Sequence, residues 1–174
     1  DYYLELSKKE SDYLLYEESM GTVSGVQTQI PVLLSEYQFQ SKEDVDAYLE
    51  LMKTTPDYFN SLIAFEQEKA QKGLFMASYT ADTVIEQCQA FIDMGDSNYL
   101  ISTFVDRIQK LTDLSESEKS DYIQKNAYML QTYVLPAYQQ LIKTVVELKD
   151  SGKNEEGLCY LPNGKEYYEL TVQA

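Results

Sequence analysis

Carboxylates are the side chains with which this sequence could do chemistry, because it has 29 Asp and Glu residues but no histidine. Glu43, Asp46 and Glu50 are spaced so that a helix would place all three on one face. A hard cation such as Ca²⁺ takes about six to eight oxygen ligands, and one helical face supplies too few. The segment 93–98 also lacks the alternating acidic positions of an EF-hand loop. We interpret these carboxylates as solvated helix faces and expect no metal ligand in this chain.

The other residue types that support catalysis are equally sparse. Without histidine, the chain has no Ser-His-Asp or Cys-His pair and no His-ligated zinc. Glycine-rich nucleotide motifs and the G-x-S-x-G elbow are missing as well. Cys88 and Cys159 do not form a C-x-x-C motif, and their spacing leaves open whether they pair. Cys88 shares a helical face with Val84 and Phe91, which predicts a small buried hydrophobe. We expect no catalytic residue in this chain.

The charge balance limits the partners of the chain. It has 14 Lys and Arg against 29 Asp and Glu, a formal net charge of −15. Nucleic acids require clustered basic residues, so the charge argues against nucleic acid as a partner, and it also disfavours binding to an anionic membrane surface. The apolar runs are far shorter than the ~18–20 residues that span a bilayer, so we expect no membrane span.

Tyrosine is unusually abundant, with 16 Tyr against 6 Phe and no Trp. Tyr122, Tyr133 and Tyr138 lie on predicted helical stripes, where a large ring with a polar tip suits the core or its edge. We expect most tyrosines to pack there. The remainder would be available to line a groove for a peptide or a sugar.

Helical periodicity and helix breakers predict a single all-α domain over 1–174, a multi-helix bundle. Ser41 is a good N-cap before the apolar stripe of Val45, Tyr48, Leu49 and Met52. The predicted helices span 1–20, 41–53, 56–72, 80–94, 98–108 and 115–149, and two more begin near Pro31 and at residue 165.

The segment 115–149 is predicted to be one long helix. Ser115 and Glu118 form a capping box before an apolar-periodic run. At 1.5 Å per residue this helix would be ~52 Å long, whereas a globule of this size has a radius of gyration of only ~16 Å. Pro136 lies inside it and removes one backbone hydrogen bond. We therefore predict a kink near Pro136.

Several ordered stretches resemble the bacterial family known as domain of unknown function 885, whose members are large helical proteins with a zinc-peptidase-like HExxH helix in their later portion. The match runs over roughly 25–170, and its most specific piece is Leu161-Pro-Asn-Gly-Lys-Glu-Tyr-Tyr168. The other pieces are 29–37 with Phe39, 44–49, 58–59, 65–69 with Gly73, 136–138 and 157–164.

The resemblance implies that the chain is the N-terminal portion of a larger protein, truncated before the HExxH helix. Because no histidine is present, no zinc ligand is carried over, and zinc would belong to the remaining C-terminal part of the parent protein. By analogy, the chain would be a non-catalytic wall of a substrate channel in a zinc metallopeptidase-like hydrolase with a peptide as its substrate. Export or lipid-anchor signals in the family suggest an extracytoplasmic or lipid-anchored parent. The candidate channel-facing residues are Gly164, Lys165, Tyr167 and Tyr168.

Two further expectations complete this interpretation. The segment 157–174 is rich in large apolar side chains, so we expect it to be mobile or to pack between molecules, with weak homodimerisation. The competing interpretation is a self-sufficient helical binding module at the cell surface. An HExxH motif in an extended reading frame would favour the peptidase interpretation.

Overall fold

The computed structural model describes residues 4, 8–9, 11–153 and 155–173. Over these residues every regular element is a helix, which confirms the all-α prediction. The elements are the 3₁₀ turns η1 (Leu14–Tyr16), η2 (Gly95–Ser97) and η4 (Leu158–Tyr160), the π-helical turn η3 (Leu130–Val134), and the helices α2 (Val26–Glu36), α3 (Lys42–Lys53), α4 (Thr55–Gln71), α5 (Ser78–Asp93), α6 (Tyr99–Ile108), α7 (Glu116–Met129), α8 (Leu135–Leu148) and α9 (Gly164–Gln173).

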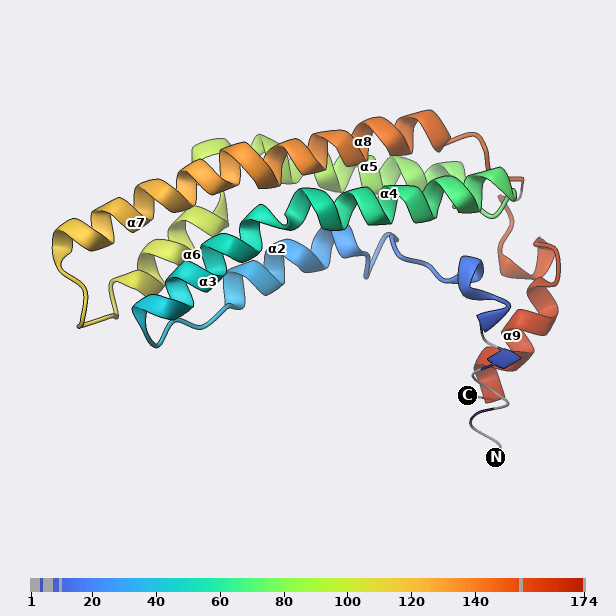
Figure 1. Ribbon diagram of the computed structural model, residues 1–174. Helices are drawn as coiled ribbons and strands as arrows, with labels where there is room; N and C mark the ends of the chain where they lie inside the picture. The colour runs from blue at the N-terminus through green and yellow to red at the C-terminus, as the bar shows by residue number, and fades with distance from the viewer. Residues whose placement is uncertain (1–3, 5–7, 10, 154, 174) are drawn as a thin grey trace.

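The helices α2 to α8 form an elongated bundle, and α9 hangs from one end of it (Figure 1). The chain runs along the bundle through α2, returns through α3 and α4, runs back through α5 and α6, and returns again through α7 and α8. Helix α8 packs on α4 and α5, α7 packs on α3 and α6, and α2 packs on α5 and α6. Helix α9 instead packs on η4, outside the bundle.

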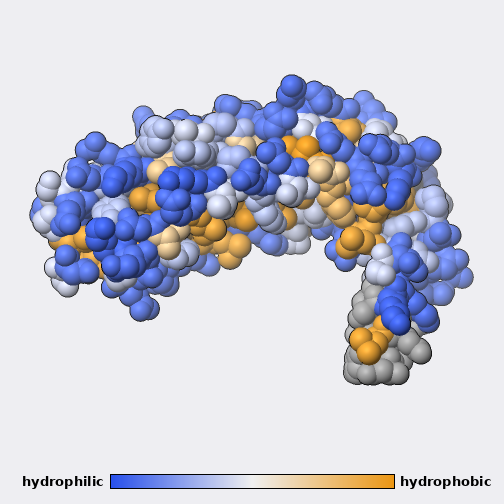
Figure 2. All heavy atoms as spheres, viewed as in Figure 1, coloured by the Kyte–Doolittle hydropathy of each residue, from blue (hydrophilic) through white to orange (hydrophobic). Residues whose placement is uncertain are grey.

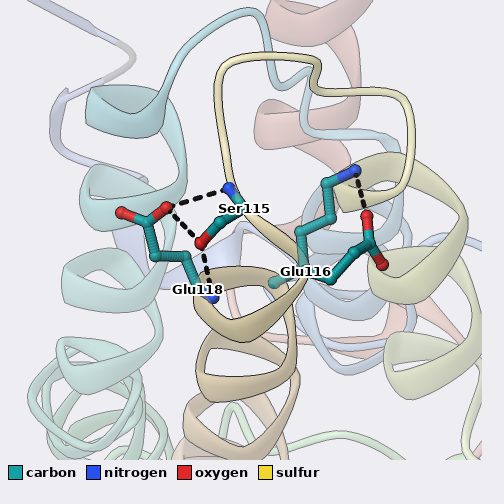
Figure 3. Close-up of polar contacts among 4 residues, drawn as sticks. Ser115, Glu116 and Glu118 are labelled. Atoms are coloured by element: carbon teal, nitrogen blue, oxygen red, sulfur yellow. Dashed lines mark hydrogen bonds and ion pairs between the residues drawn. The ribbon is translucent and has the colours of Figure 1, made fainter.

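The long helical segment predicted over 115–149 is confirmed, and it begins with the predicted capping box (Figure 3). The Ser115 N–H donates to Glu118 Oε2 at 2.9 Å, and the Glu118 N–H donates to Ser115 Oγ at 3.3 Å. These hydrogen bonds from Ser115 hold the pKa of Glu118 below its usual value. In the next positions Lys119 and Glu116 form an ion pair at 3.1 Å. The start of this helix is therefore determined locally.

Near Pro136 the segment departs from regular α-helix at the π-helical turn η3. The bent long helix of this structure is 42–71, and not the segment around Pro136 where the kink was predicted. The Leu135 N–H donates to Leu130 O, five residues back, where an α-helix would bond four residues back. Pro136 has no N–H to offer Thr132, so α-helical bonding could not have continued unbroken there. A second long segment, 42–71, is bent by 37°, and Thr54 lies at the junction of its two helices, α3 and α4.

Helix α2 begins at Val26, not near Pro31 as predicted, and Pro31 lies inside it. The sequence prediction placed proline in the first turn because its ring removes the hydrogen bond to the carbonyl four residues back. In this helix that carbonyl belongs to Gln27, and it accepts a hydrogen bond of 2.7 Å from the buried Tyr138 hydroxyl of α8. A tertiary contact therefore replaces the bond that Pro31 cannot make.

The predicted helix over 1–20 is wrong beyond residue 11, where the chain forms turns and η1. The positions Tyr2 and Leu6 of the predicted stripe lie outside the described residues. The reason for the error lies in α4, because buried polar groups on that helix bind the chain at residues 17–19. Those contacts hold the segment in an irregular conformation that local spacing does not predict.

Aromatic side chains fill the core in two clusters, as expected for most of the tyrosines. Tyr138 lies 4.9 Å from Phe59 and 4.6 Å from Phe91 between ring centroids. In the second cluster Tyr48 packs on Phe104, and the Arg107 guanidinium stacks over Tyr48 at 5.0 Å. Arg107 also donates to the carbonyls of Leu34 and Tyr37 near the end of α2, which joins that end to α6.

Candidate functional site

A cavity of about 310 Å³ lies at the corner where α9 joins the bundle. Four parts of the chain meet there: the N-terminal segment, the end of α4, the start of α5, and the loop 157–161. Figure 2 shows hydrophobic surface at this end of the bundle. We call it the corner cavity, and its lining residues are Tyr16, Glu18, Met20, Gly21, Thr22, Lys69, Leu74, Phe75, Met76, Ala77, Tyr79, Thr80, Gly157, Leu158 and Leu161.

Lys69 lines the cavity and belongs to a buried ion pair. Its Nζ lies 3.5 Å from Glu66 Oε1, and the two side chains are only 5% and 1% exposed. The same ammonium group donates to the Glu17 carbonyl at 2.8 Å, and the Ser19 hydroxyl donates to Glu66 Oε1. Glu66 Oε2 has no hydrogen-bond partner among the described residues. Burying two charges is costly, so this pair is stable only because its partners satisfy most of the polar atoms.

The pair also positions the N-terminal segment, which in turn positions α9. Lys69 and Glu66 fix residues 17–19 on α4, and the Tyr16 hydroxyl donates to the Pro162 carbonyl. The rings of Tyr13 and Tyr16 lie 5.7 and 5.2 Å from the ring of Tyr167 in α9. Burial raises the pKa of Tyr16, which keeps its hydroxyl protonated as a donor. The corner cavity is thus formed by contacts between residues far apart in sequence.

Glu155 closes the N-terminal end of α5 beside the cavity. Its carboxylate accepts from the Ser78 N–H at 2.9 and 3.0 Å and from the Ser78 hydroxyl at 2.7 Å. These bonds lower the pKa of Glu155, and its negative charge suits the positive end of the helix dipole. The start of α5 is therefore already occupied by a carboxylate of the chain itself.

None of the four residues predicted to face a channel lines the corner cavity. Gly164 is buried, and a Cβ there would lie 1.8 Å from the Leu158 carbonyl oxygen, so only glycine fits. Lys165 is exposed and lies 3.9 Å from Glu169, while Tyr167 packs on the N-terminal segment. Tyr168 is exposed. The cavity is formed instead by the beginning of the same family-matched stretch, at Gly157, Leu158 and Leu161.

The sequence contains one signal for this site. Glu66 and Lys69 follow Leu62 and Phe65 along one helical stripe, where buried positions are normally apolar. Charged residues at such positions indicate a paired, buried polar site. Their partners, the Glu17 carbonyl and the Ser19 hydroxyl, could not be found from spacing, because they lie about 50 residues away in sequence.

The site contains few groups with chemical reactivity. Among the described residues, no group of three or more His, Cys, Asp or Glu side chains is placed to hold a metal ion. Cys88 and Cys159 are both free thiols, the first buried and the second exposed. Burial raises the pKa of Cys88 to about 12, so its thiol stays protonated. Neither thiol lines the corner cavity.

Across the described part of the chain, every helix is too short or too polar to pass through a lipid bilayer.

Comparisons with known proteins give one family and a solved structure of similar fold. The sequence profile of a family described as "Bacterial protein of unknown function (DUF885)" matches residues 2–174. No curated protein matches the chain. Among solved structures, a "putative lipoprotein" from Colwellia psychrerythraea superposes with a TM-score of 0.85 at 18% sequence identity. The match covers 90% of this chain and 27% of that protein, so the chain spans about a quarter of the length of its solved relative.

Proposed function

This chain belongs to the DUF885 family of bacterial proteins, and we propose that it forms a non-catalytic wall of a substrate channel in a larger, zinc-peptidase-like hydrolase. The observation that carries the proposal is the corner cavity, which combines aromatic and aliphatic side chains with one buried ammonium group. Such a lining suits a peptide, whose backbone and side chains offer both apolar surface and hydrogen-bond acceptors. The zinc and its ligands would come from the remainder of the larger protein.

The solved relative supports the proposal in one further respect. Its matched part makes up 27% of a longer chain, so this fold occurs as one portion of a larger molecule. The relative is named as a lipoprotein, and on that ground we propose an extracytoplasmic, lipid-anchored location for the parent of this chain as well. A location outside the cytoplasm suits an enzyme that degrades peptides taken from the surroundings.

Tyr79 provides the sharpest test, because it lines the cavity and is 61% exposed, so its removal leaves the fold intact. In the longer protein that contains this chain, we expect Tyr79→Ala to raise KM for peptides about three- to tenfold while kcat is unchanged. Tyr128→Ala is the matched control, since Tyr128 is 59% exposed and lies in α7, away from the cavity. Equal KM values for both variants and the unmodified protein would refute the channel-wall proposal.

The alternative is a self-sufficient binding module at the cell surface, and the lipoprotein name of the solved relative is the observation that favours it. Calorimetry with the purified 174-residue chain separates the two proposals. A module that works by itself should bind a peptide or sugar with a Kd near the micromolar range. A channel wall, which supplies only part of a site, should show no saturable binding below about 1 mM.

A further inference from the structure

An apolar groove of about 210 Å³ runs between α2 and the junction of α3 with α4. We call it the α2 groove. Leu33 is 62% exposed on one side of it, and Leu51 and Tyr58 are 45% and 49% exposed on the other. Its complete lining is Ile30, Leu33, Leu34, Leu51, Thr54, Thr55 and Tyr58.

The groove stays open because α2 makes its main contacts elsewhere. Helix α2 packs on α5 and α6, and its residues Ile30, Leu33 and Leu34 line one side of the groove. The bend itself is fixed at Thr54, whose hydroxyl donates to the Leu51 carbonyl at 2.7 Å. Figure 2 shows hydrophobic surface along the edge of the bundle where α2 and α3 lie.

The chemistry of the groove restricts what it can bind. None of its lining residues is charged, although the whole sequence carries a net charge of −15. The nearest cation on α3, Lys53, is paired with Glu50. A charged ligand would find no opposite charge among the lining residues, whereas an aliphatic helix face would bury apolar surface against Leu33 and Leu51.

We propose that the α2 groove receives the apolar face of a helix from the remainder of the longer protein. This inference rests on the proposed function, in that it requires this chain to be one portion of a larger molecule. Two observations select this occupant. The same fold makes up only 27% of its solved relative, which leaves most of that protein to pack around it. The lining of the groove contains no charged residue, which suits the apolar face of a helix.

Thiol labelling measures whether the groove is covered. Cys159 is exposed and is first replaced by serine, whereas Cys88 is buried and stays. Leu33→Cys is then introduced in the 174-residue chain and in the longer protein, and the rate of alkylation is compared. We expect the rate at position 33 to fall at least about tenfold in the longer protein. Val146→Cys is the matched control, because Val146 is 56% exposed on α8, and we expect its rate to change less than about twofold.

Each other outcome contradicts the proposal. Equal rates at position 33 in both proteins would mean that nothing covers the groove. Slow labelling in the 174-residue chain that becomes faster on dilution would mean that a second copy occupies it. A reading frame that ends at residue 174 would remove the proposed occupant altogether.

The proposed function fails separately, because it depends on catalysis. A longer protein that protects position 33 but hydrolyses no peptide would support the docked helix and contradict the proposed hydrolase. Conversely, a longer protein that cleaves peptides while position 33 labels freely would support the proposed hydrolase and contradict the groove as a docking surface.

Discussion

The bundle and the α9 corner use the same aromatic residue in two different ways. In the bundle, Tyr138 is fully buried between Phe59 and Phe91 and donates its hydroxyl to a backbone carbonyl. In the corner, Tyr167 stacks on Tyr13 and Tyr16 at the edge of the molecule, and in α9 only Gly164 and Leu170 are buried among the described side chains. The difference indicates that the bundle folds around its tyrosines, whereas α9 is attached by them.

The largest contrast should appear when each tyrosine is truncated. We expect Tyr138→Ala to cost about 4–5 kcal/mol, because it leaves a cavity and also leaves the Gln27 carbonyl without a donor. Tyr167→Ala should cost about 1 kcal/mol or less, because its ring is only partly buried. Urea unfolding curves of the two variants provide the measurement. Similar losses for both would mean that α9 is as much a part of the core as α8.

The buried ion pair joins the two regions, and breaking it should have the next largest effect. Lys69→Met leaves the Glu66 carboxylate buried without its cation, and we expect a loss of about 3 kcal/mol or more. In the double variant Lys69→Met with Glu66→Leu, most of that loss should be recovered, because no charge remains buried. Thermal unfolding followed by circular dichroism tests this. If the single variant is as stable as the double variant, the unpaired charge of Glu66 does not destabilise the folded chain.

The two cysteines report on the two regions in one experiment. We expect Cys159, exposed in η4, to react with iodoacetamide at least about 100-fold faster than Cys88 in the folded chain. Cys88 lies in the bundle, where burial keeps its thiol protonated, and it should react only after denaturant is added. Mass spectrometry counts the labels on each cysteine with time. Comparable rates for both in the native chain would mean that the bundle opens near α5.

The smallest expected effect concerns pH. The folded-state pKa of Glu155 is lowered from 4.5 by the hydrogen bonds of Ser78, so its contribution is present above pH 4.5 and is lost as the pH falls through the lowered value. Glu155→Gln should therefore flatten the part of the stability profile that lies below pH 4.5. Urea titrations at several pH values measure it. If the stability profiles of the variant and the unmodified chain are parallel, the hydrogen bonds between Glu155 and Ser78 do not contribute to stability.

Local signals in the sequence predict the helix starts that depend on neighbouring residues. The N-cap at Ser41 and the capping box at Ser115 form as expected, and each involves residues three positions apart. The corner cavity could not be predicted in this way, since it brings together Tyr16 and Pro162, and Glu17 and Lys69. The start of α2 could not be predicted in this way either. Spacing predicts Pro31 at a helix start, but Pro31 lies inside α2 because Tyr138, 107 positions away, donates a hydrogen bond to the carbonyl that Pro31 leaves without a partner. The surroundings of Tyr167 could not be predicted either, because its ring packs on Tyr13 and Tyr16 of the N-terminal segment.

The hydrogen bond from Tyr138 to Gln27 has a consequence for the order in which the chain folds. During synthesis α2 leaves the ribosome more than 100 residues before the hydroxyl that completes it. Until then its Gln27 carbonyl can bond only to water, and the proline makes the isolated helix still less stable than its 11 residues imply. We therefore expect α2 to become a stable helix late, after α8 has docked on α5. The first helix of the bundle in sequence would then be among the last to form.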